Sequence, residues 1–326
     1  MRIRLLIAVA FLAMIGLAAF EGQGGQEASP LIVPSPSVES AKGSPLAAPA
    51  TAFSSPDPTP VVSVLFDGKS ALGFAADQMS FGPRPTGSQA NIAAGNYIIS
   101  RLREYRWQVA EQPFDYLGTQ ARNIIATRGN GPTLIVGAHY DTRRRADRDQ
   151  DDPTQPVPGA NDGASGVAVL VELARVLDVE ATGHRVQLIF FDAEDNGGLD
   201  GWDWIAGSTH AANSLYETPQ MMVLVDMVGD ADQQIYWEST SDVDLRARIW
   251  NTAAELGYEG FFLPQIRHSI LDDHTPFLRK GIPAVDIIDF DYPYWHTTGD
   301  TLDKISTASL ERVGRTLQVW LERGAP

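Results

Sequence analysis

Five acidic or imidazole side chains occupy positions in the sequence that are typical of a metal site: His139, Asp162, Asp195, Asp226 and His296. His139 and Asp226 directly follow apolar runs, and Asp195 comes shortly after a third such run. Ligands of open α/β sheets bind outside the carboxyl ends of the strands, so these side chains are expected to meet at one edge of a sheet. Because the chain has no cysteine, a thiolate site is excluded. The pattern predicts a catalytic zinc site of carboxylates and imidazoles with an open coordination position.

Each of these residues also has a structural interpretation when it is considered alone. An aspartate such as Asp226 at a strand end commonly caps a turn, and Asp162 in the segment NDG is typical of a turn or a helix N-cap. A single buried histidine such as His139 is more often hydrogen-bonded than bound to a metal. The prediction of a metal site therefore rests on the combination. Glu194, adjacent to Asp195, is the candidate general acid and base beside it.

Other polar residues fit the site less well. The run Arg143–Arg145 is predicted to form a solvated loop whose charge is offset by the aspartates that follow, with contact to substrate as the alternative. His274, in the segment DDHTPF, either reaches the site or is a hydrogen-bonded structural residue. The remaining histidines and most tryptophans belong to no such pattern and are expected to be structural: His184, His210, His268, Trp107, Trp237, Trp250 and Trp320.

Apolar periodicity places the candidate ligands on an alternating series of strands and helices. Continuous apolar runs predict buried strands, and apolar residues at i, i+3, i+4 and i+7 predict helices. The strands are predicted over 133–138, 186–191 and 221–225, and the helices over 91–105, 167–177 and 310–321. Strands buried on both faces that alternate with helices predict an α/β fold. We expect a three-layer sandwich with a central, mostly parallel mixed sheet and helices on both faces.

Composition limits the classes of function. The chain has 326 residues, 44% of them hydrophobic, so it can bury a large core. Its formal net charge of -16 makes it a poor ligand for nucleic acid or for an anionic membrane surface. No phosphate-binding glycine loop and no nicotinamide or flavin signature is present. A monomer is the default expectation.

The first 61 residues differ from the rest of the chain. Arg2 and Arg4 precede an apolar run from Leu5 to Phe20, which resembles either a cleaved signal peptide or a short N-terminal membrane anchor. Residues 21–61 are rich in Pro, Ser and Ala, with 8 of the 21 prolines between Pro30 and Pro60, and are predicted to form a disordered linker. Residues 62–326 are then the catalytic domain, which is expected to be exported: secreted, periplasmic or held at the cell surface.

Several motifs together resemble a known family. The segments GAHYDT, PGANDGASG and FFDAED are similar to those of the zinc aminopeptidase superfamily. The segments LDDHTPFLRKGIPAVDII and YWHTTGDT narrow the resemblance to the animal-type glutaminyl cyclases and their bacterial relatives. These enzymes convert an N-terminal glutamine to pyroglutamate and release ammonia. The resemblance covers the chain from about Phe81 to Glu322, and it implies a zinc-aminopeptidase-like fold.

The resemblance assigns roles to individual residues. The zinc ligands of the family fall on Asp162, Asp195 and His296, and one ion is expected. The general acid and base falls on Glu194, and two further active-site aspartates fall on Asp226 and Asp272. The two tryptophan walls of the substrate pocket fall on Trp204 and Trp295. Trp202 lies close enough in sequence to take the place of Trp204. The animal enzymes have a glutamate at the position of Asp195 and a cystine near the site, and this chain has neither.

Three functions remain open at this point. The first is cyclisation of peptides or proteins that begin with glutamine, with Glu194 moving the proton. The second is hydrolysis by a zinc aminopeptidase, in which His139 and Asp226 complete a site for a second metal ion that shares Asp162. The third is a non-catalytic module that binds peptide N-termini. The presence of every ligand position and of Glu194 favours the two enzymes over the binding module.

Overall fold

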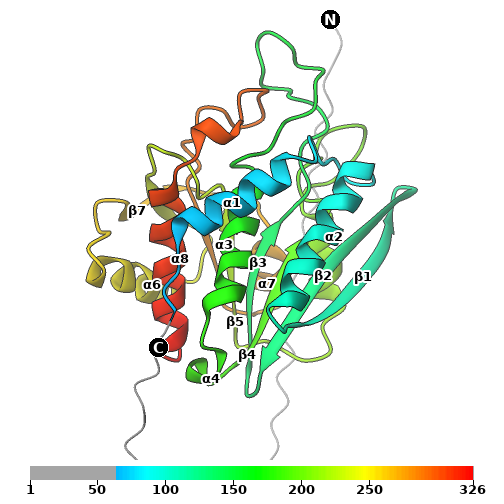
Figure 1. Ribbon diagram of the computed structural model, residues 1–326. Coiled ribbons are helices and arrows are strands. Elements are labelled where there is room, and N and C mark those ends of the chain that lie inside the picture. The colour runs from blue at the N-terminus through cyan, green and yellow to red at the C-terminus, as the bar shows by residue number, and fades with distance from the viewer. Residues whose placement is uncertain (1–63, 326) are drawn as a thin grey trace, which may run out of the picture. The chain divides into compact units, whose positions relative to one another are not determined.

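The computed structural model describes residues 64–325, whose centre is a six-stranded sheet (Figure 1). The strand order is β1-β2-β4-β3-β5-β8. The strands are β1 Gln108–Tyr116, β2 Thr119–Gly129, β3 Thr133–His139, β4 Arg185–Phe191, β5 Met221–Asp226 and β8 Ala284–Ile288. β4, β3, β5 and β8 run parallel, and the β1–β2 hairpin extends the sheet with β2 antiparallel to β4. The four parallel strands therefore end at the same edge.

Helices cover the two faces of the sheet unequally (Figure 1). One face packs against α1 Gly68–Met79, α2 Gln89–Glu104, α3 Ala164–Val176 and α8 Thr307–Glu322, and the other against α5 Ala206–Asn213 and α7 Thr275–Leu278. Alternate side chains of β3 point to opposite faces: Leu134 and Val136 belong to the larger core, and Ile135 to the smaller one. Because every residue of β3 is buried, side chains must cover both faces of this strand.

The larger core crosses the sheet as a row of aligned side chains. Val136 pairs with Leu188 on β4 and with Val223 on β5, and Val223 pairs with Val285 on β8. All four are fully buried. This register brings the ends of β3, β4 and β5 level with one another, so the residues that follow these strands are neighbours.

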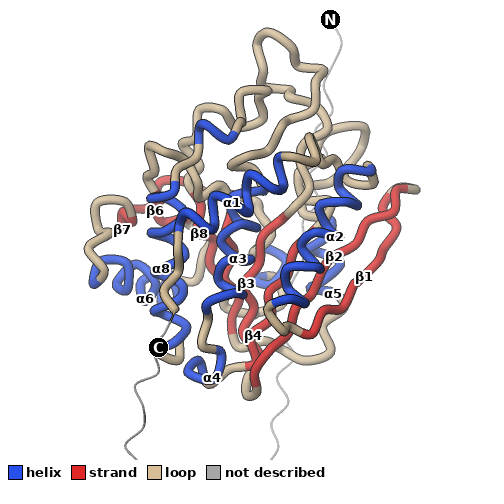
Figure 2. Tube along the Cα trace, in the orientation of Figure 1, coloured by secondary structure: helices blue, strands red, loops and turns tan. Residues whose placement is uncertain are grey.

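The remaining elements lie beside the main sheet. A two-stranded parallel sheet of β6 Ile235–Glu238 and β7 Phe262–His268 is joined by α6 Val243–Glu255. α4 Val179–Thr182 and the 3-10 helix η1 Leu302–Lys304 are single turns. Long loops gather at one end of the sheet, in the upper part of Figure 2. Within residues 64–325, no helix has the length and apolar character required to cross a bilayer.

The predicted fold class is confirmed: the chain forms a three-layer α/β sandwich with a mostly parallel mixed sheet. The predicted strands and helices correspond to β3, β4, β5, α2, α3 and α8, with ends that differ by a few residues. The signal peptide or anchor, the linker over residues 21–61 and the first residues of the predicted catalytic domain lie outside the described part of the chain.

The start of α3 approaches the end of β5 so closely that only glycine fits between them. A Cβ atom at Gly166 would lie 2.2 Å from the backbone oxygen of Val225. We expect Gly166→Ala to lower the free energy of unfolding by about 1–3 kcal/mol, because the helix must move away from the strand. Chemical denaturation measures this change.

Gly73 provides the matched control. It lies within α1, and an added Cβ there would have no atom within 4 Å. Gly73→Ala should raise the free energy of unfolding by about 0.5–1 kcal/mol, since alanine loses less backbone freedom on folding. Equal effects of the two substitutions would contradict the proposed close contact.

Candidate metal centre and active site

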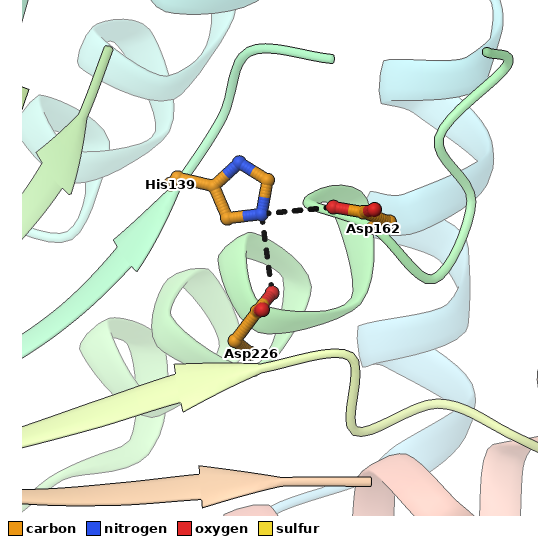
Figure 3. A group of neighbouring side chains, drawn as sticks. All are labelled: His139, Asp162 and Asp226. Atoms are coloured by element: carbon orange, nitrogen blue, oxygen red, sulfur yellow. Dashed lines mark hydrogen bonds and ion pairs between the residues drawn. The ribbon is translucent and has the colours of Figure 1, made fainter. Parts of the chain in front are cut away.

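The candidate ligands come from separate elements and converge at the carboxyl edge of the sheet. His139 is the last residue of β3, and Asp226 is the last residue of β5. Asp162 lies in the loop that leads into α3, Asp195 lies beyond the end of β4, and His296 lies in the loop after β8. Figure 3 shows His139 at the end of its strand, with its ring directed toward Asp162 and Asp226. The predicted convergence therefore occurs.

These five residues form two groups that share Asp162. In the first group, His296 Nε2 lies 3.0 Å from Asp195 Oδ1 and 3.7 Å from Asp162 Oδ2. In the second, His139 Nε2 lies 3.1 Å from Asp226 Oδ1 and 3.2 Å from Asp162 Oδ1. Each group offers three ligand atoms within 4.8 Å of one another. All five side chains are buried.

The first group fits a zinc ion. Among the described residues, the buried atoms Asp162 Oδ2 and Asp195 Oδ2 have no hydrogen-bond partner. Unpaired carboxylate oxygens are costly inside a protein, and a bound cation would satisfy them. Two carboxylates and one imidazole are a donor set that zinc accepts, with a fourth position left for substrate.

Two further aspartates hold the ligand segments through the backbone. The Asp141 carboxylate accepts hydrogen bonds from the backbone N–H groups of Glu194 and Asp195, at 3.1 and 3.3 Å. The Asp300 carboxylate accepts from the N–H groups of Asn161 and Asp162, at 2.8 and 3.1 Å. Neither aspartate was singled out in the sequence, although Asp141 stands two residues after His139 in the segment GAHYDT.

Burial shifts the pKa values of the acidic groups at the site. Burial, followed by the nearby charge of Asp162, raises the pKa of Asp195 to about 6. Burial also raises the pKa of Glu194 well above its usual value, and the charges of Asp195 and Asp272 add to the effect. A divalent cation at the first group would oppose these shifts, because it stabilises the ionised carboxylates. Burial and the neighbouring carboxyl groups thus disfavour negative charge at the site, and a bound cation would offset this effect.

A cavity of about 210 Å³ opens directly above the first group. Its polar floor is formed by Asp162, Glu194, Asp195, Asp226, Asp272 and His296. Its walls are mainly apolar and include Trp204, Trp295, Phe290, Ile270 and Leu271. The Trp204 ring lies parallel to the His296 ring, with centroids 5.8 Å apart and an interplanar angle of 10°. The cavity can therefore hold an uncharged chain against the metal site.

Comparison with known proteins agrees with this geometry. Residues 123–321 match the family model described as peptidase family M28. The chain belongs to peptidase family M28. It is a bacterial-type relative of the glutaminyl-peptide cyclotransferases within the zinc aminopeptidase superfamily. The resemblance seen in the motifs is thus confirmed.

Three relatives illustrate the range of the family. A glutaminyl-peptide cyclotransferase of Drosophila melanogaster is 27% identical over 278 residues, covering 73% of this chain and 76% of its own length. The crystal structure of Porphyromonas gingivalis glutaminyl cyclase superimposes with a TM-score of 0.75 at 33% identity, covering 79% of this chain and 98% of that one. A structure described as a leucine aminopeptidase precursor from Bacteroides thetaiotaomicron gives 0.74 at 32% identity, covering 80% and 97%.

Within this M28 fold, the two candidate tryptophans occupy different places. Trp204 lines the cavity, as the family resemblance implies. Trp202 is buried in a separate apolar cluster, and its ring packs edge-on against Tyr116 with centroids 5.1 Å apart. Trp295 also lines the cavity, with its ring centroid 4.0 Å from that of His296. The choice between Trp202 and Trp204 is therefore resolved in favour of Trp204.

Asp272 lies at the floor of the cavity and leads into a second layer of buried acids. Burial raises the pKa of Asp286 well above its usual value, with the charges of Asp272 and Asp226 as further causes. A protonated Asp286 can donate a hydrogen bond to the Asp272 carboxylate. Asp273, next in sequence, is also fully buried. Asp286 escaped notice in the sequence because it lies within an apolar strand segment.

The remaining histidines take structural places. The buried His274 ring lies 2.8 Å from Thr240 Oγ1 and 3.4 Å from Glu238 Oε2, and it does not line the cavity. His184 contacts the backbone oxygen of Thr182 at 2.6 Å. His210 stacks on Phe114, and His268 pairs with Asp291.

The interpretation of Arg143 as part of a solvated loop is wrong. Its side chain is only 3% exposed, and it donates hydrogen bonds to the backbone oxygens of Asp195 and Gly197. Arg145 does point outward and pairs with Asp200. A run of three arginines gives no indication of which one turns inward, because that depends on carbonyl groups supplied by a loop 52 residues away.

A larger groove, of about 610 Å³, lies over β1, β2 and β4 beside α5. Its lining is a mixture of glutamines, threonines and apolar side chains, and its charged residues Arg185 and Glu217 pair with each other. No residue of the two ligand groups lines this groove. We therefore place the active site in the smaller cavity.

Removal of a ligand should weaken metal binding selectively. We expect His296→Ala to lower the zinc affinity by at least about 100-fold, since even loss of a group that only supports a ligand costs about 10–100-fold. Competition with a chromophoric chelator measures the affinity. His268→Ala is the control, because His268 pairs with Asp291 away from both groups. Unchanged zinc affinity in the His296 variant would exclude it as a ligand.

Proposed function

We propose that this chain is a zinc-dependent glutaminyl cyclase, which converts N-terminal glutamine of peptides or proteins to pyroglutamate and releases ammonia. The observation that carries the proposal is the placement of Glu194 and the group Asp162–Asp195–His296 at the floor of a cavity of about 210 Å³ with walls of Trp204 and Trp295. A cavity of this kind suits a single folded-back glutamine side chain. The names of the cyclotransferase relatives support the same reaction.

In the proposed reaction, Asp162, Asp195 and His296 hold one zinc ion. A zinc ion held there would polarise the carbonyl of the γ-amide and stabilise the negative charge that develops on its oxygen. Trp204 and Trp295 confine the N-terminal glutamine, so that its α-amine and the carbonyl carbon of its side-chain amide are held near each other. The walls also exclude water, which would otherwise compete as a nucleophile.

Glu194 is proposed to move the proton. The substrate's α-amine forms a bond to the carbonyl carbon of the side-chain amide, and Glu194 accepts a proton from that amine. Glu194 then delivers the proton to the amide nitrogen as the bond between this nitrogen and the carbonyl carbon breaks. Ammonia leaves, and no water is consumed. Burial raises the pKa of Glu194, and the bound ion lowers it, so the two effects bring the carboxyl group toward the range of a general acid and base.

Asp226 and Asp272 complete the polar floor and are proposed to orient Glu194 and the leaving group. Asp226 is fixed by its contact with His139 at 3.1 Å, and its carboxylate also accepts the Met227 N–H at 2.8 Å. Asp272 accepts the Asp273 N–H at 2.6 Å. Because both carboxylates are tied to their neighbours, they can orient Glu194 and the leaving group without changing position.

The second candidate is a zinc aminopeptidase. The group His139–Asp162–Asp226 supports it, because it offers three ligand atoms for a second ion. A relative named as a leucine aminopeptidase precursor also supports it. Against it, His139 Nε2 lies within hydrogen-bond distance of both carboxylates, so its one N–H can be shared between them without a metal. A non-catalytic module that binds peptide N-termini is the weakest candidate, because it has no need of Glu194 at the cavity floor.

Substrates and location follow from the sequence and are proposals. We propose that the chain is exported, either secreted, periplasmic or held by an uncleaved N-terminal anchor, and that it acts as a monomer. Its substrates would be peptides or proteins that begin with glutamine, and nucleic acid is not expected among its partners.

Substitution of the proposed acid and base should separate binding from catalysis. We expect Glu194→Gln to retain zinc and to lower kcat by at least about 100-fold, because general acid and base catalysis contributes 10²–10⁴-fold. Mass spectrometry of a short peptide that begins with glutamine measures turnover as loss of ammonia. Near-normal turnover in this variant would remove Glu194 from the mechanism.

The products and the number of metal ions should distinguish the two enzymes. A cyclase is expected to remove only ammonia from the peptide and to reach full activity with one zinc ion per chain. A peptidase would release the free N-terminal amino acid and would need two. His139→Ala should reduce the number of bound ions only in the second case. Release of amino acids with two ions bound would replace the proposed function with hydrolysis.

A further inference from the structure

Arg143 occupies an unusual place for an arginine that follows a strand. Its guanidinium group is buried and forms a paired contact with Asp147, Nε to Oδ1 at 2.7 Å and Nη2 to Oδ2 at 2.8 Å. Nη1 donates to the backbone oxygen of Asp195 at 2.9 Å and to that of Gly197 at 3.3 Å. The planar fork of one arginine thus connects its own loop to the segment that carries a candidate metal ligand.

Arg143 and Asp147 also lie close to two ligands of the first group, Asp195 and His296. Arg143 Nη1 lies 3.8 Å from Asp195 Oδ1. Asp147 Oδ1 lies 3.6 Å from Nδ1 of His296, the ring nitrogen opposite the Nε2 that faces the carboxylates. A carboxylate near the outer nitrogen of a ligating histidine favours the tautomer in which the inner nitrogen is free to bind metal.

Arg143 also contacts a wall of the cavity. Its guanidinium carbon lies 4.7 Å from the centroid of the Trp204 ring, within the range of a cation–π contact. Trp204 in turn lies parallel to His296. Displacement of the Arg143 guanidinium group would therefore remove support from Trp204 as well as from Asp195 and His296.

The loop of Arg143 is fastened to the loop of His296 at further points. The backbone N–H of Arg148 donates to the backbone oxygen of His296 at 3.2 Å. The guanidinium carbon of Arg148 lies 3.9 Å from the Trp295 ring centroid. The Asp149 carboxylate accepts the Thr298 N–H at 2.8 Å. The two loops therefore form one unit over the metal site.

We infer that Arg143, together with Asp147, is a positioning residue that holds Asp195, His296 and Trp204 in the arrangement that binds zinc and substrate. The inference rests on the proposed metal site. It does not give Arg143 contact with the reacting atoms, because its fork is occupied by Asp147 and by two backbone oxygens.

Charge and position predict opposite results, which makes the inference testable. The positive charge of Arg143 lies near Asp195 and repels a bound cation, so its loss would strengthen zinc binding if charge alone mattered. If position dominates, loss of the fork weakens zinc binding. Lysine keeps the charge but cannot form the planar paired contact, so Arg143→Lys isolates the effect of position.

The experiment compares Arg143→Lys, Arg143→Met and Asp147→Asn with Arg145→Met, in the full chain. Arg145 is the matched control, because it belongs to the same run but is exposed and pairs with Asp200. We expect zinc affinity, measured by chelator competition, to fall about 10–100-fold in both Arg143 variants and less in Asp147→Asn. We also expect KM for a glutamine peptide at saturating zinc to rise in the Arg143 variants, since Trp204 loses its support. Arg145→Met should match the wild type.

Zinc affinity that stays unchanged in Arg143→Lys, or rises in Arg143→Met, would overturn the inference. A purely structural role would lower the Tm of the metal-free protein and leave the zinc affinity of the folded fraction unchanged, which also contradicts it. If neither Arg143 variant folds, Asp147→Asn decides the matter through zinc affinity alone. A wild-type protein that binds zinc but releases amino acids would refute cyclisation and leave this inference intact.

Discussion

The buried carboxylate of Asp162 is the constraint on which the site depends, because both ligand groups share it. It lies against His139 on one side and faces His296 on the other, at 3.2 and 3.7 Å. Asp195 and Asp226 bring two more buried carboxyl groups to the same point. Burial opposes the ionisation of Asp162, but the hydrogen bond from His139 and the charges of the two histidines lower its pKa. The imidazole groups of His139 and His296 therefore stabilise this cluster of buried acids at the edge of the sheet.

The backbone that carries these ligands is held by still more acids, and buried arginines offset them. Asp300 and Asp141 accept backbone N–H groups from the two ligand segments. Each such carboxylate fixes a loop but adds negative charge near the metal site. Arg84 is fully buried and donates to the backbone oxygen of Gly159 at 2.6 Å, on the loop that carries Asp162. Arg143 serves the segment of Asp195 in the same way. Rigid loops and charge balance are thus obtained from the same side chains.

Much of this arrangement could be predicted from the sequence, and the reason is the regularity of the parallel sheet. Once the apolar runs before His139 and Asp226 are taken as neighbouring strands, the two side chains must lie at one edge. The Trp204 and Trp202 alternatives, in contrast, depend on how a loop folds, and no periodicity distinguishes them. Arg143 and Asp286 were missed for another reason. A charged residue in a polar run or an acid in an apolar strand has no pattern of its own, and its partners come from segments far away in the sequence.

Cyclisation and hydrolysis can use the same floor of ligands, so the walls and the second group must decide between them. A hydrolase has to admit and activate water, and it must also leave space for the rest of the peptide beside the scissile bond. A cyclase receives its nucleophile with the substrate and benefits when water is excluded. The cavity here is small and lined by Trp204, Trp295 and Phe290, which favours exclusion. A single N–H at His139 Nε2 can be shared between Asp162 Oδ1 and Asp226 Oδ1 without a second ion. If the His139 N–H occupies that group in place of a second ion, the Asp226 carboxylate can orient Glu194 and the leaving group, which is the role proposed for it in cyclisation.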